Sequence, residues 1–446
     1  MKLFQYCYLL TVLLLLGSCS ISKKISKAAN FILLKDSVIS TGHIGICIYE
    51  PAKGKYWYNL NATKYFTPAS NTKLFSLYAG LKYLGDSLIG ARYWTDENNL
   101  FILPAGDPTF LHPHFSKQPL LYLMKATSDT IFISLKDNIL PYGRGWAWDD
   151  FDQGYVAERS MLPVFGNQLW LNQKPFITNN LSGNWLTDTK HFVAAQSLYI
   201  QPAYFVKDIF YQKDAMYARK QNENKFLVDS ITGLTNIPFI SNNGITQLEI
   251  LNDITHKSFK TFETKLKYYE DYKVLKSQPT DSMLTPMMHN SDNFFAEQTL
   301  LMASNEHLGY MNDEAIIDTL LKKDLKDIPQ KPSWVDGSGL SRYNLFTPQS
   351  FIYLLNKMKN EFGLDRLKTI LPTGGTGTFK NYYVNDSSFI YAKTGSLSGC
   401  IALSGYLITR KNKLLIFSVL TNNFKGRATA VRRAVEKFIT GIRMEY

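Results

Sequence analysis

Ser70 and Lys73 are the residues of this sequence whose types and spacing most directly suggest chemistry. They stand in Thr67-Pro-Ala-Ser-Asn-Thr-Lys73, at the start of a segment with helical spacing of apolar residues. A separation of three residues on a helix brings both side chains to one face, with Cβ atoms roughly 5–6 Å apart. A serine here can also be a simple helix cap, although a capping box would have Glu or Gln in place of the lysine. The pair therefore suggests a serine nucleophile beside an amine base.

The helix that positions this pair is predicted from the apolar residues that follow it. They recur with the i, i+3, i+4, i+7 spacing of a helix that buries one face, at Leu74, Leu77, Tyr78, Leu81 and Leu84. A lysine near the helix start faces the positive end of the helix dipole, which favours the neutral amine that a base requires.

Length and composition describe a globular chain. Its 446 residues correspond to about three domains, and a 45% hydrophobic content is ample for several cores. The 49 lysines and arginines against 37 aspartates and glutamates give a net charge of +12. Because no dense basic run with interleaved aromatic residues occurs, this charge favours acidic surfaces or polymers, and we expect no nucleic-acid partner.

The N-terminus predicts export. Met1-Lys2 and the apolar run Tyr8–Leu16 are typical of a signal peptide and are too short for the roughly 20 residues of a spanning helix. Leu16-Gly-Ser-Cys19 resembles a bacterial lipobox, with an ordinary small-residue cleavage site as the alternative. We therefore expect residues 1–18 to be removed and Cys19 to be lipidated, which gives a periplasmic, membrane-anchored lipoprotein.

The remaining cysteines are expected to be buried. Cys7 leaves with the signal peptide, whereas Cys47 and Cys400 each lie in a predicted strand. A disulfide between them would be compatible with an oxidising periplasm. Free buried thiols are the favoured expectation, because a bridge requires Cα atoms within ~7 Å and nothing in the sequence brings them together.

The rest of the chain predicts one α+β domain that an insertion interrupts. A short amphipathic helix at 21–34 and a hairpin of strands His43–Tyr49 and Tyr56–Leu60 precede the Ser70 helix. From residue 106 to 276, short aromatic or β-branched runs broken by Asn, Gly and Pro predict a largely β insertion of one or two modules. The strands expected there are Asp129–Leu135, Gly166–Leu171, Lys225–Val228 and Gln247–Leu251.

Helical spacing returns after the insertion. Helices are predicted at Pro286–Ser304, Glu314–Leu325, Pro348–Phe362 and Ala428–Met444, and strands at Ser388–Ala392, Ile401–Thr409 and Lys413–Leu420. We therefore predict an antiparallel sheet flanked by helices, with residues 19–105 as its first part, 106–276 as the insertion and 277–446 as its second part.

Two further motifs complete the chemistry. Ser291-Asp-Asn293 lies in the helical region after the insertion, and Lys393-Thr-Gly-Ser396 ends a predicted edge strand. Ser-x-x-Lys, Ser-Asp-Asn and Lys-Thr-Gly form the motif set of penicillin-binding proteins and class A β-lactamases. By contrast, the seven histidines show no metal-ligand spacing beyond His112-x-His114, which is more typical of a surface loop.

The order of the motifs and the position of the insertion resemble one family in particular. The chain is similar to the low-molecular-mass class C penicillin-binding proteins, the D-alanyl-D-alanine carboxypeptidase/endopeptidase family, whose extra domains lie between the first two motifs. Other stretches share this resemblance: Gly106-Asp-Pro108, Asn293-Phe-Phe-Ala-Glu297, Asp336-Gly-Ser-Gly-Leu-Ser-Arg342 and Leu371-Pro-Thr-Gly-Gly-Thr-Gly377. The resemblance implies a serine transpeptidase/β-lactamase-like fold, peptidoglycan stem peptides as substrates, β-lactams as inhibitors, and no metal or cofactor.

It also implies a role for each motif residue. Ser70 would attack the carbonyl of the penultimate D-alanine and form an acyl-enzyme, while neutral Lys73 takes its proton. Ser291 would relay the proton to the leaving amine, and Asn293 would hold Lys73 or the substrate peptide. The N–H groups of Ser70 and Ser396 would form an oxyanion hole.

The Lys-Thr-Gly strand would bind the end of the substrate. Lys393, Thr394 and Ser396 would hold the terminal carboxylate, and Gly395 would let the substrate approach the strand closely. For the stretch from Asp336 to Arg342, support of a tight turn is favoured over contact with substrate.

Two other functions stay open at this stage. One is a β-lactamase or related serine hydrolase, although such enzymes usually lack the long insertion. The other is a catalytically silent envelope scaffold that binds peptidoglycan, against which the intact Ser70, Lys73, Ser291 and Lys393 argue. Whether terminal D-alanine or cross-links are cut, and the oligomeric state, also stay open.

Overall fold

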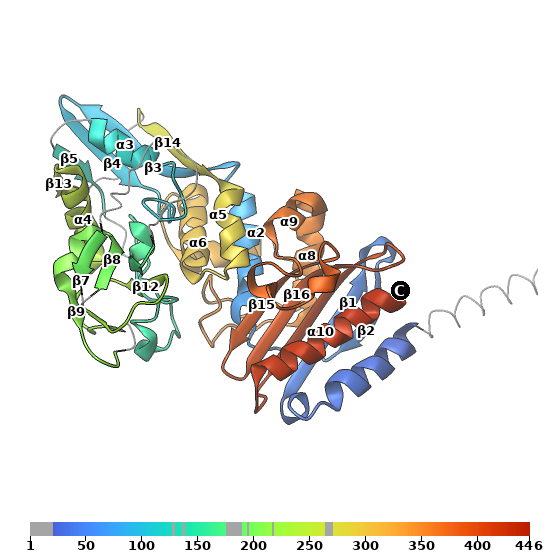
Figure 1. Ribbon diagram of the computed structural model, residues 1–446. Helices are drawn as coiled ribbons and strands as arrows, with labels where there is room; N and C mark the ends of the chain where they lie inside the picture. Colours follow the sequence, from blue (N-terminus) through green and yellow to red (C-terminus); the bar gives the residue numbers. More distant parts are fainter. Residues whose placement is uncertain are drawn as a thin grey trace, which may run out of the picture.

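The structure is a computed structural model that describes residues 21–126, 130–135, 139–174, 190–193, 196–215, 218–263 and 271–446. Figure 1 shows two lobes. The main lobe contains the sheet with β1, β2, β15 and β16, and the inserted lobe runs from β3, in light blue, through the green elements to β14, in yellow. Helices α2, α5 and α6 lie between the sheet of the main lobe and the inserted lobe.

The main lobe is built on a five-stranded sheet in the order β15-β16-β17-β1-β2, with every neighbouring pair antiparallel. Its strands are β1 (His43–Glu50), β2 (Lys55–Leu60), β15 (Ile390–Leu397), β16 (Cys400–Ile408) and β17 (Leu414–Asn422). The N-terminal hairpin thus joins the three C-terminal strands through the pairing of β1 with β17. This confirms the predicted α+β fold with an antiparallel sheet and places the Lys-Thr-Gly strand at its edge.

Helices cover both faces of this sheet. On one face, α2 (Lys73–Tyr83) and α8 (Pro348–Phe362) contribute to a core in which Phe75 contacts Phe346 and Phe351. The other face packs on α10 (Ala428–Glu445) and on the helical segment that starts at residue 21. Because strand residues alternate between faces, the sheet buries apolar side chains in two separate cores.

The helices after the insertion form where helical spacing predicts them, with one break. The segment predicted as Pro286–Ser304 is two helices, α5 (Thr280–His289) and α6 (Asn293–Leu308), and Ser291 lies in the turn between them. A left-handed Ser291, with φ of +59°, and a capping Asp292 end one helix and start the next. The chain continues through α7 (Asp313–Lys322), and α9 (Leu364–Ile370) follows α8.

The inserted lobe contains three sheets and two helices among the described residues. One sheet has the order β13-β5-β4-β3-β14, a second β12-β6-β8-β7 and a third β10-β11-β9. The bounds of these elements are β3 (Ser87–Asp96), β4 (Asn99–Pro104), α3 (Pro119–Ala126), β5 (Thr130–Ile133), β6 (Gln168–Asn172), β7 (Lys190–Val193), β8 (Gln196–Gln201), β9 (Ile209–Tyr211), β10 (Ala218–Arg219), β11 (Phe226–Val228), β12 (Thr235–Pro238), α4 (Ile245–Thr255), β13 (Ser258–Thr261) and β14 (Lys273–Pro279).

The insertion begins earlier than the sequence predicts. The hairpin of β3 and β4 lies before the expected boundary at residues 105 and 106, but β3 pairs with β14 and β4 pairs with β5. The lobe therefore starts at Ser87 and ends at Pro279, because strand pairing with distant segments, rather than local composition, decides which sheet the hairpin joins.

One predicted strand is wrong. The run Gln247–Leu251 lies in α4, whose buried residues include Leu248, Leu251 and Thr255 at helical spacing. Its short apolar run fits either a strand or a helix, and the preceding Ser241, which accepts the N–H of Gly244, provides a turn that starts the helix.

The predicted signal peptide and lipidation site lie outside the described residues. Among the residues that are described, no helix is long and apolar enough to cross a membrane. Cys47 and Cys400 are both buried and free, as favoured from the sequence.

Candidate active site

Ser70 and Lys73 lie at the junction of a short 3₁₀ turn and α2. The turn covers Ala69–Thr72, and Lys73 is the first residue of the α-helix. With three residues per turn, a 3₁₀ helix brings residues i and i+3 to the same side. Ala69 has a left-handed φ of +47°, a costly conformation that occurs most often at functional sites. The local fold therefore presents the serine and the lysine together.

The amine of Lys73 is held by three oxygen atoms. Its Nζ lies 3.1 Å from Ser70 Oγ, 2.5 Å from Asn293 Oδ1 and 2.7 Å from the carbonyl oxygen of Ser338. The Asn293 orientation is fixed because its Nδ2 donates to the carbonyl oxygen of Tyr155. Two acceptor-only oxygens can take the two N–H bonds of a neutral amine, which leaves its lone pair for the serine hydroxyl.

Burial lowers the pKa of the Lys73 amine. Lys73 is fully buried, and desolvation lowers its pKa from 10.5 to about 8, while the charges of Asp336, Asp292 and Glu297 oppose that shift. A value near 8 leaves a useful fraction of the lysine neutral at physiological pH, as a general base requires.

The Ser-Asp-Asn motif has one task for each residue. Ser291 occupies the left-handed turn, and the Asp292 carboxylate caps α6 by accepting the N–H of Phe295. Asn293 is the first residue of α6 and reaches Lys73. A single N-capped helix start therefore delivers both polar side chains to the site.

The Lys-Thr-Gly motif lies within β15 rather than at its end. Lys393 is fully buried, and its Nζ donates to Ser291 Oγ and to the carbonyl oxygen of Thr394, both at 2.8 Å. Burial, followed by the charge of Lys73, lowers the pKa of Lys393 well below 10.5. Lys393 therefore links the motif of α6 to that of β15.

Gly395 allows β15 to press against the start of the helix. A Cβ at this position would lie 2.5 Å from the carbonyl oxygen of Pro68 and 3.1 Å from the Ser70 nitrogen. Only a residue without a side chain permits this approach. Beside it, Thr394 Oγ1 contacts Thr378 Oγ1, and Ser396 Oγ accepts a hydrogen bond from Arg432.

The turn from Asp336 to Arg342 supports Lys73. The buried Asp336 carboxylate accepts the N–H groups of Gly339 and Ser341, and it also accepts from Trp146 of the inserted lobe. This turn places the Ser338 carbonyl against Lys73. These contacts support the predicted structural role of Asp336.

Arg342 has a different position. It is exposed and approaches the carbonyl oxygen of Ser398. Among the described residues it forms no ion pair with Asp336, so the turn is held by main-chain and amide hydrogen bonds instead.

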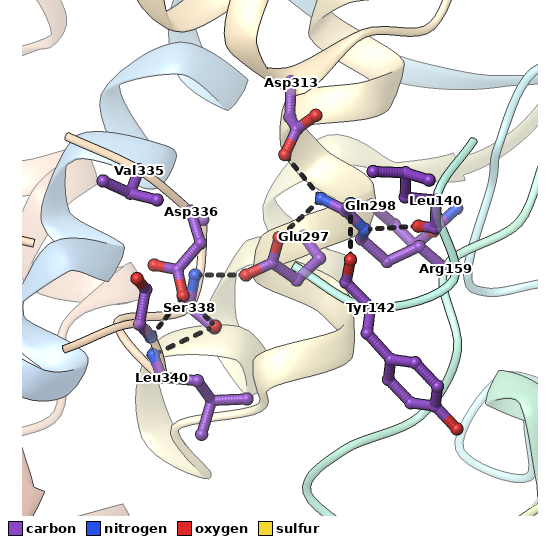
Figure 2. A network of polar contacts seen from close by, with 12 residues as sticks. Leu140, Tyr142, Arg159, Glu297, Gln298, Asp313, Val335, Asp336, Ser338 and Leu340 are labelled. Atoms are coloured by element: carbon purple, nitrogen blue, oxygen red, sulfur yellow. Dashed lines mark hydrogen bonds and ion pairs between the residues drawn. The ribbon is translucent and has the colours of Figure 1, made fainter. Parts of the chain in front are cut away.

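A buried polar network connects this turn to the inserted lobe (Figure 2). Glu297 of α6 accepts the Ser338 N–H at 2.7 Å, and its other oxygen lies 3.5 Å from Arg159 Nη1. Arg159 also pairs with Asp313 and donates to the carbonyl oxygen of Leu140. Burial and the charge of Asp336 raise the pKa of Glu297 to about 7, although Arg159 opposes this.

Two pockets meet at Ser70, Ser291 and Ser396, which line both of them. The larger, of about 590 Å³, lies between the lobes and includes Trp146 and Tyr155. The smaller, of about 320 Å³, lies between β15, β16, α10 and the turn at 377–383. Ser70 therefore lies where the two pockets join.

The structure thus gathers every predicted site residue that it describes: Ser70, Lys73, Ser291, Asn293, Lys393, Thr394, Gly395 and Ser396. Cys19 lies outside the described residues. Sequence reasoning missed Arg159 and Arg432, because nothing in the local sequence distinguishes them from other charged residues. It included Glu297 in the stretch Asn293-Phe-Phe-Ala-Glu297 but gave it no role.

His112 is also placed differently from the expectation of a surface loop. It is buried against Trp170 and Phe295. In the described part of the chain, no group of three His, Cys, Asp or Glu residues is arranged to hold a metal ion.

Comparison with known proteins agrees with this geometry. Residues 259–444 match the profile of the D-Ala-D-Ala carboxypeptidase 3 (S13) family. The penicillin-sensitive carboxypeptidase A of Dictyostelium discoideum is 22% identical, and the alignment covers 88% of this chain and 85% of that protein. A D-alanyl-D-alanine carboxypeptidase of Actinomadura sp. is also 22% identical, with 90% of this chain and 82% of that protein covered.

Among solved structures, penicillin binding protein 4 of Haemophilus influenzae superimposes with a TM-score of 0.67 at 18% identity. The superposition covers 94% of this chain and 98% of that one, and the same protein has been solved in complex with a β-lactam. At this identity the superposition establishes the fold alone. The chain is thus similar to the D-Ala-D-Ala carboxypeptidase 3 (S13) family over residues 259–444 and to two carboxypeptidases along most of its length.

Proposed function

We propose that this protein is a serine DD-peptidase that cleaves D-alanyl-D-alanine termini, D-alanyl cross-links or both in peptidoglycan through an acyl-enzyme on Ser70. The observation that carries the proposal is the environment of Lys73, a fully buried amine 3.1 Å from Ser70 Oγ with a pKa lowered to about 8. A silent scaffold has no need to bury an amine beside a serine, which costs stability.

Acylation follows from these contacts. Asn293 Oδ1 and the Ser338 carbonyl oxygen hold the N–H groups of neutral Lys73, so its lone pair accepts the proton of Ser70 as Oγ attacks the substrate carbonyl. The close approach at Gly395 brings the main chain of β15 next to the Ser70 nitrogen, where N–H groups of Ser70 and Ser396 would stabilise the oxyanion. One such donor contributes about 2.7–4 kcal/mol in comparable enzymes.

The leaving amine needs a proton, and the site contains a path for it. Ser291 Oγ accepts from Lys393 at 2.8 Å and lines both pockets beside Ser70. Ser291 would pass its proton to the leaving D-alanine and regain one from the lysines. Water then hydrolyses the ester with Lys73 acting again as base.

Labelling with penicillin tests this proposal. Because β-lactams mimic D-alanyl-D-alanine, the parent protein should form one long-lived penicilloyl ester on the peptide that contains Ser70, detectable by mass spectrometry. It should also release D-alanine from a pentapeptide stem or cut D-alanyl-cross-linked muropeptides.

The Ser70→Ala variant is the matched control and should do neither. Absence of both adduct and cleavage in the folded parent protein would contradict the proposal. Rapid multiple turnover of penicillin without muropeptide cleavage would favour a β-lactamase instead.

We further propose that the protein is exported and anchored to a membrane by lipid on Cys19. The support is the apolar run Tyr8–Leu16 followed by Leu16-Gly-Ser-Cys19. Intact-mass analysis of protein from the membrane fraction should find a mature chain that starts at acylated Cys19. An unmodified start at another residue would overturn this proposal.

A further inference from the structure

The smaller pocket beside Ser70 carries a cation that the mechanism above does not use. Thr394 and Ser396 form its rim on the side of β15, and Val435 of α10 lies in its wall. Arg432, one helical turn before Val435, lines the same pocket. The pocket thus combines an apolar wall with one guanidinium close to the reacting serine.

Arg432 is tied to the Lys-Thr-Gly strand but is electrostatically unpaired. Its Nη2 donates to Ser396 Oγ at 2.7 Å. Within the described residues no carboxylate lies at ion-pair distance from it, whereas the adjacent Arg433 pairs with Glu436. A guanidinium has five N–H donors, so Arg432 keeps donors for an anion next to Ser396.

The volumes and charged residues of the two pockets indicate which end of the substrate each pocket binds. The larger pocket, of about 590 Å³, lies between the lobes and has room for the stem peptide that remains bound as the acyl group. Asp150 and Arg342 both line it, so its positive charge is offset by a negative one, whereas Arg432 is the charged residue that lines the smaller pocket. The smaller pocket, of about 320 Å³, includes Thr394 and Ser291 and suits a single departing amino acid.

The charge of Arg432 matters because the neighbouring lysines are poor sources of positive charge. Burial lowers the pKa of Lys73 to about 8 and that of Lys393 well below 10.5. Unlike a buried lysine, an arginine keeps its positive charge, and it can bind a carboxylate with two parallel hydrogen bonds.

We propose that Arg432 binds the free carboxylate of the leaving amino acid and makes the enzyme prefer substrates that end in a free carboxylate. The proposal rests on the DD-peptidase function and adds a specificity-determining residue on α10. In this arrangement Ser396 Oγ and Arg432 hold the same carboxylate, and the apolar wall of the pocket accepts the side chain of the departing residue.

A pair of substrates tests the proposal. An N-acylated L-Lys-D-Ala-D-Ala peptide is compared with its C-terminal carboxamide, and kcat/KM is measured for release of the last residue. The parent protein should prefer the acid. Arg432→Gln should lower kcat/KM for the acid roughly 10- to 100-fold, the range expected for a charged hydrogen bond, and change that for the amide little.

Two further variants make the test specific. Lys437→Gln removes an exposed positive charge from the same helix and should leave the acid-to-amide ratio unchanged. Arg432→Lys keeps the charge and should restore part of the preference. If Arg432 only held Ser396 in place, Arg432→Gln would lower kcat/KM equally for the acid and for the amide.

The outcomes separate this proposal from the one on which it rests. Failure of the parent protein to acylate with penicillin or to release any product would overturn the DD-peptidase function itself. An active parent whose acid-to-amide ratio is the same in Arg432→Gln would overturn only the assignment of Arg432. An equal loss on both substrates would also overturn it and would assign Arg432 to the support of Ser396.

Discussion

The buried amine of Lys73 makes a quantitative prediction about the pH dependence of acylation. The difference between its ordinary pKa of 10.5 and the value of about 8 corresponds to roughly 3 kcal/mol. At pH 7 about one Lys73 in ten would be neutral, compared with about one in three thousand for an unperturbed lysine. Burial would therefore raise the rate at pH 7 by roughly 300-fold.

The expected profile follows from this fraction. The second-order rate constant for acylation by a fluorescent penicillin should rise about tenfold per pH unit below pH 7 and level off above about pH 8. Stopped-flow measurement from pH 5.5 to 9.5 at constant ionic strength would give the midpoint, with circular dichroism at each pH as a control for folding. If the logarithm of the rate constant still rises by one per pH unit up to pH 9.5, the lysine pKa is not lowered. A rate constant that does not change with pH would refute Lys73 as the titrating base.

Glu297→Gln provides a second test of the same reasoning. The charge of Glu297 raises the pKa of Lys73, and the amide removes this charge but keeps an oxygen that can accept the Ser338 N–H. The midpoint of the acylation profile should therefore move to lower pH. A midpoint that stays in place would show that the Glu297 charge does not reach the lysine.

Three further changes have expected outcomes. Arg159→Leu would leave Glu297 buried without its cation and should lower the free energy of unfolding by about 3–5 kcal/mol in urea titrations. Arg433→Leu, which breaks an exposed pair, should change it far less. Gly395→Ala would place a Cβ 2.5 Å from a main-chain oxygen, so stopped-flow acylation should slow by roughly 100-fold while the protein stays folded; an unchanged rate would contradict the close approach. Lys73→Met should abolish acylation and stabilise the protein at pH 7 by up to ~3 kcal/mol. The pKa of Lys73 is about 8 in the folded parent and 10.5 when unfolded, so between pH 8 and 10.5 the unfolded parent binds more protons than the folded one. The free energy of unfolding of the parent should therefore rise with pH over this range. The stability advantage of Lys73→Met should shrink correspondingly.

The elements with strong local signals were predictable from the sequence. Short apolar runs located each strand of the main sheet, although β15 continues five residues beyond its predicted end at Ala392. Helical spacing located α7, α8 and α10 to within a few residues. The motif residues were predictable for a related reason. Each motif is a short contiguous run that can be recognised without the fold, whereas the left-handed φ of Ser291 and the close approach at Gly395 are seen only in the structure.

The features that escaped prediction depend on contacts between distant segments. Whether the hairpin of β3 and β4 belongs to the main lobe is decided by the pairing of β3 with β14, 180 to 192 residues later in the chain. The helix α4 was mistaken for a strand because a five-residue apolar run fits both periods. Arg432 lies in a helix predicted from the sequence, yet nothing local shows that it faces Ser396.

The same contacts change how the insertion should be understood. Three polar contacts from the inserted lobe end on residues that position Lys73: the Tyr155 carbonyl oxygen fixes Asn293, Trp146 donates to Asp336, and Arg159 pairs with Glu297. Asn293 supplies one of the oxygens that hold the Lys73 amine. Asp336 and Glu297 accept main-chain N–H groups of the turn whose Ser338 carbonyl supplies another. The lobe between the first two motifs therefore helps to hold Lys73 in place and also forms a wall of the larger pocket. If Lys73 is the base, as we propose, this support matters for the rate, because a displacement of about 1 Å can cost 100-fold.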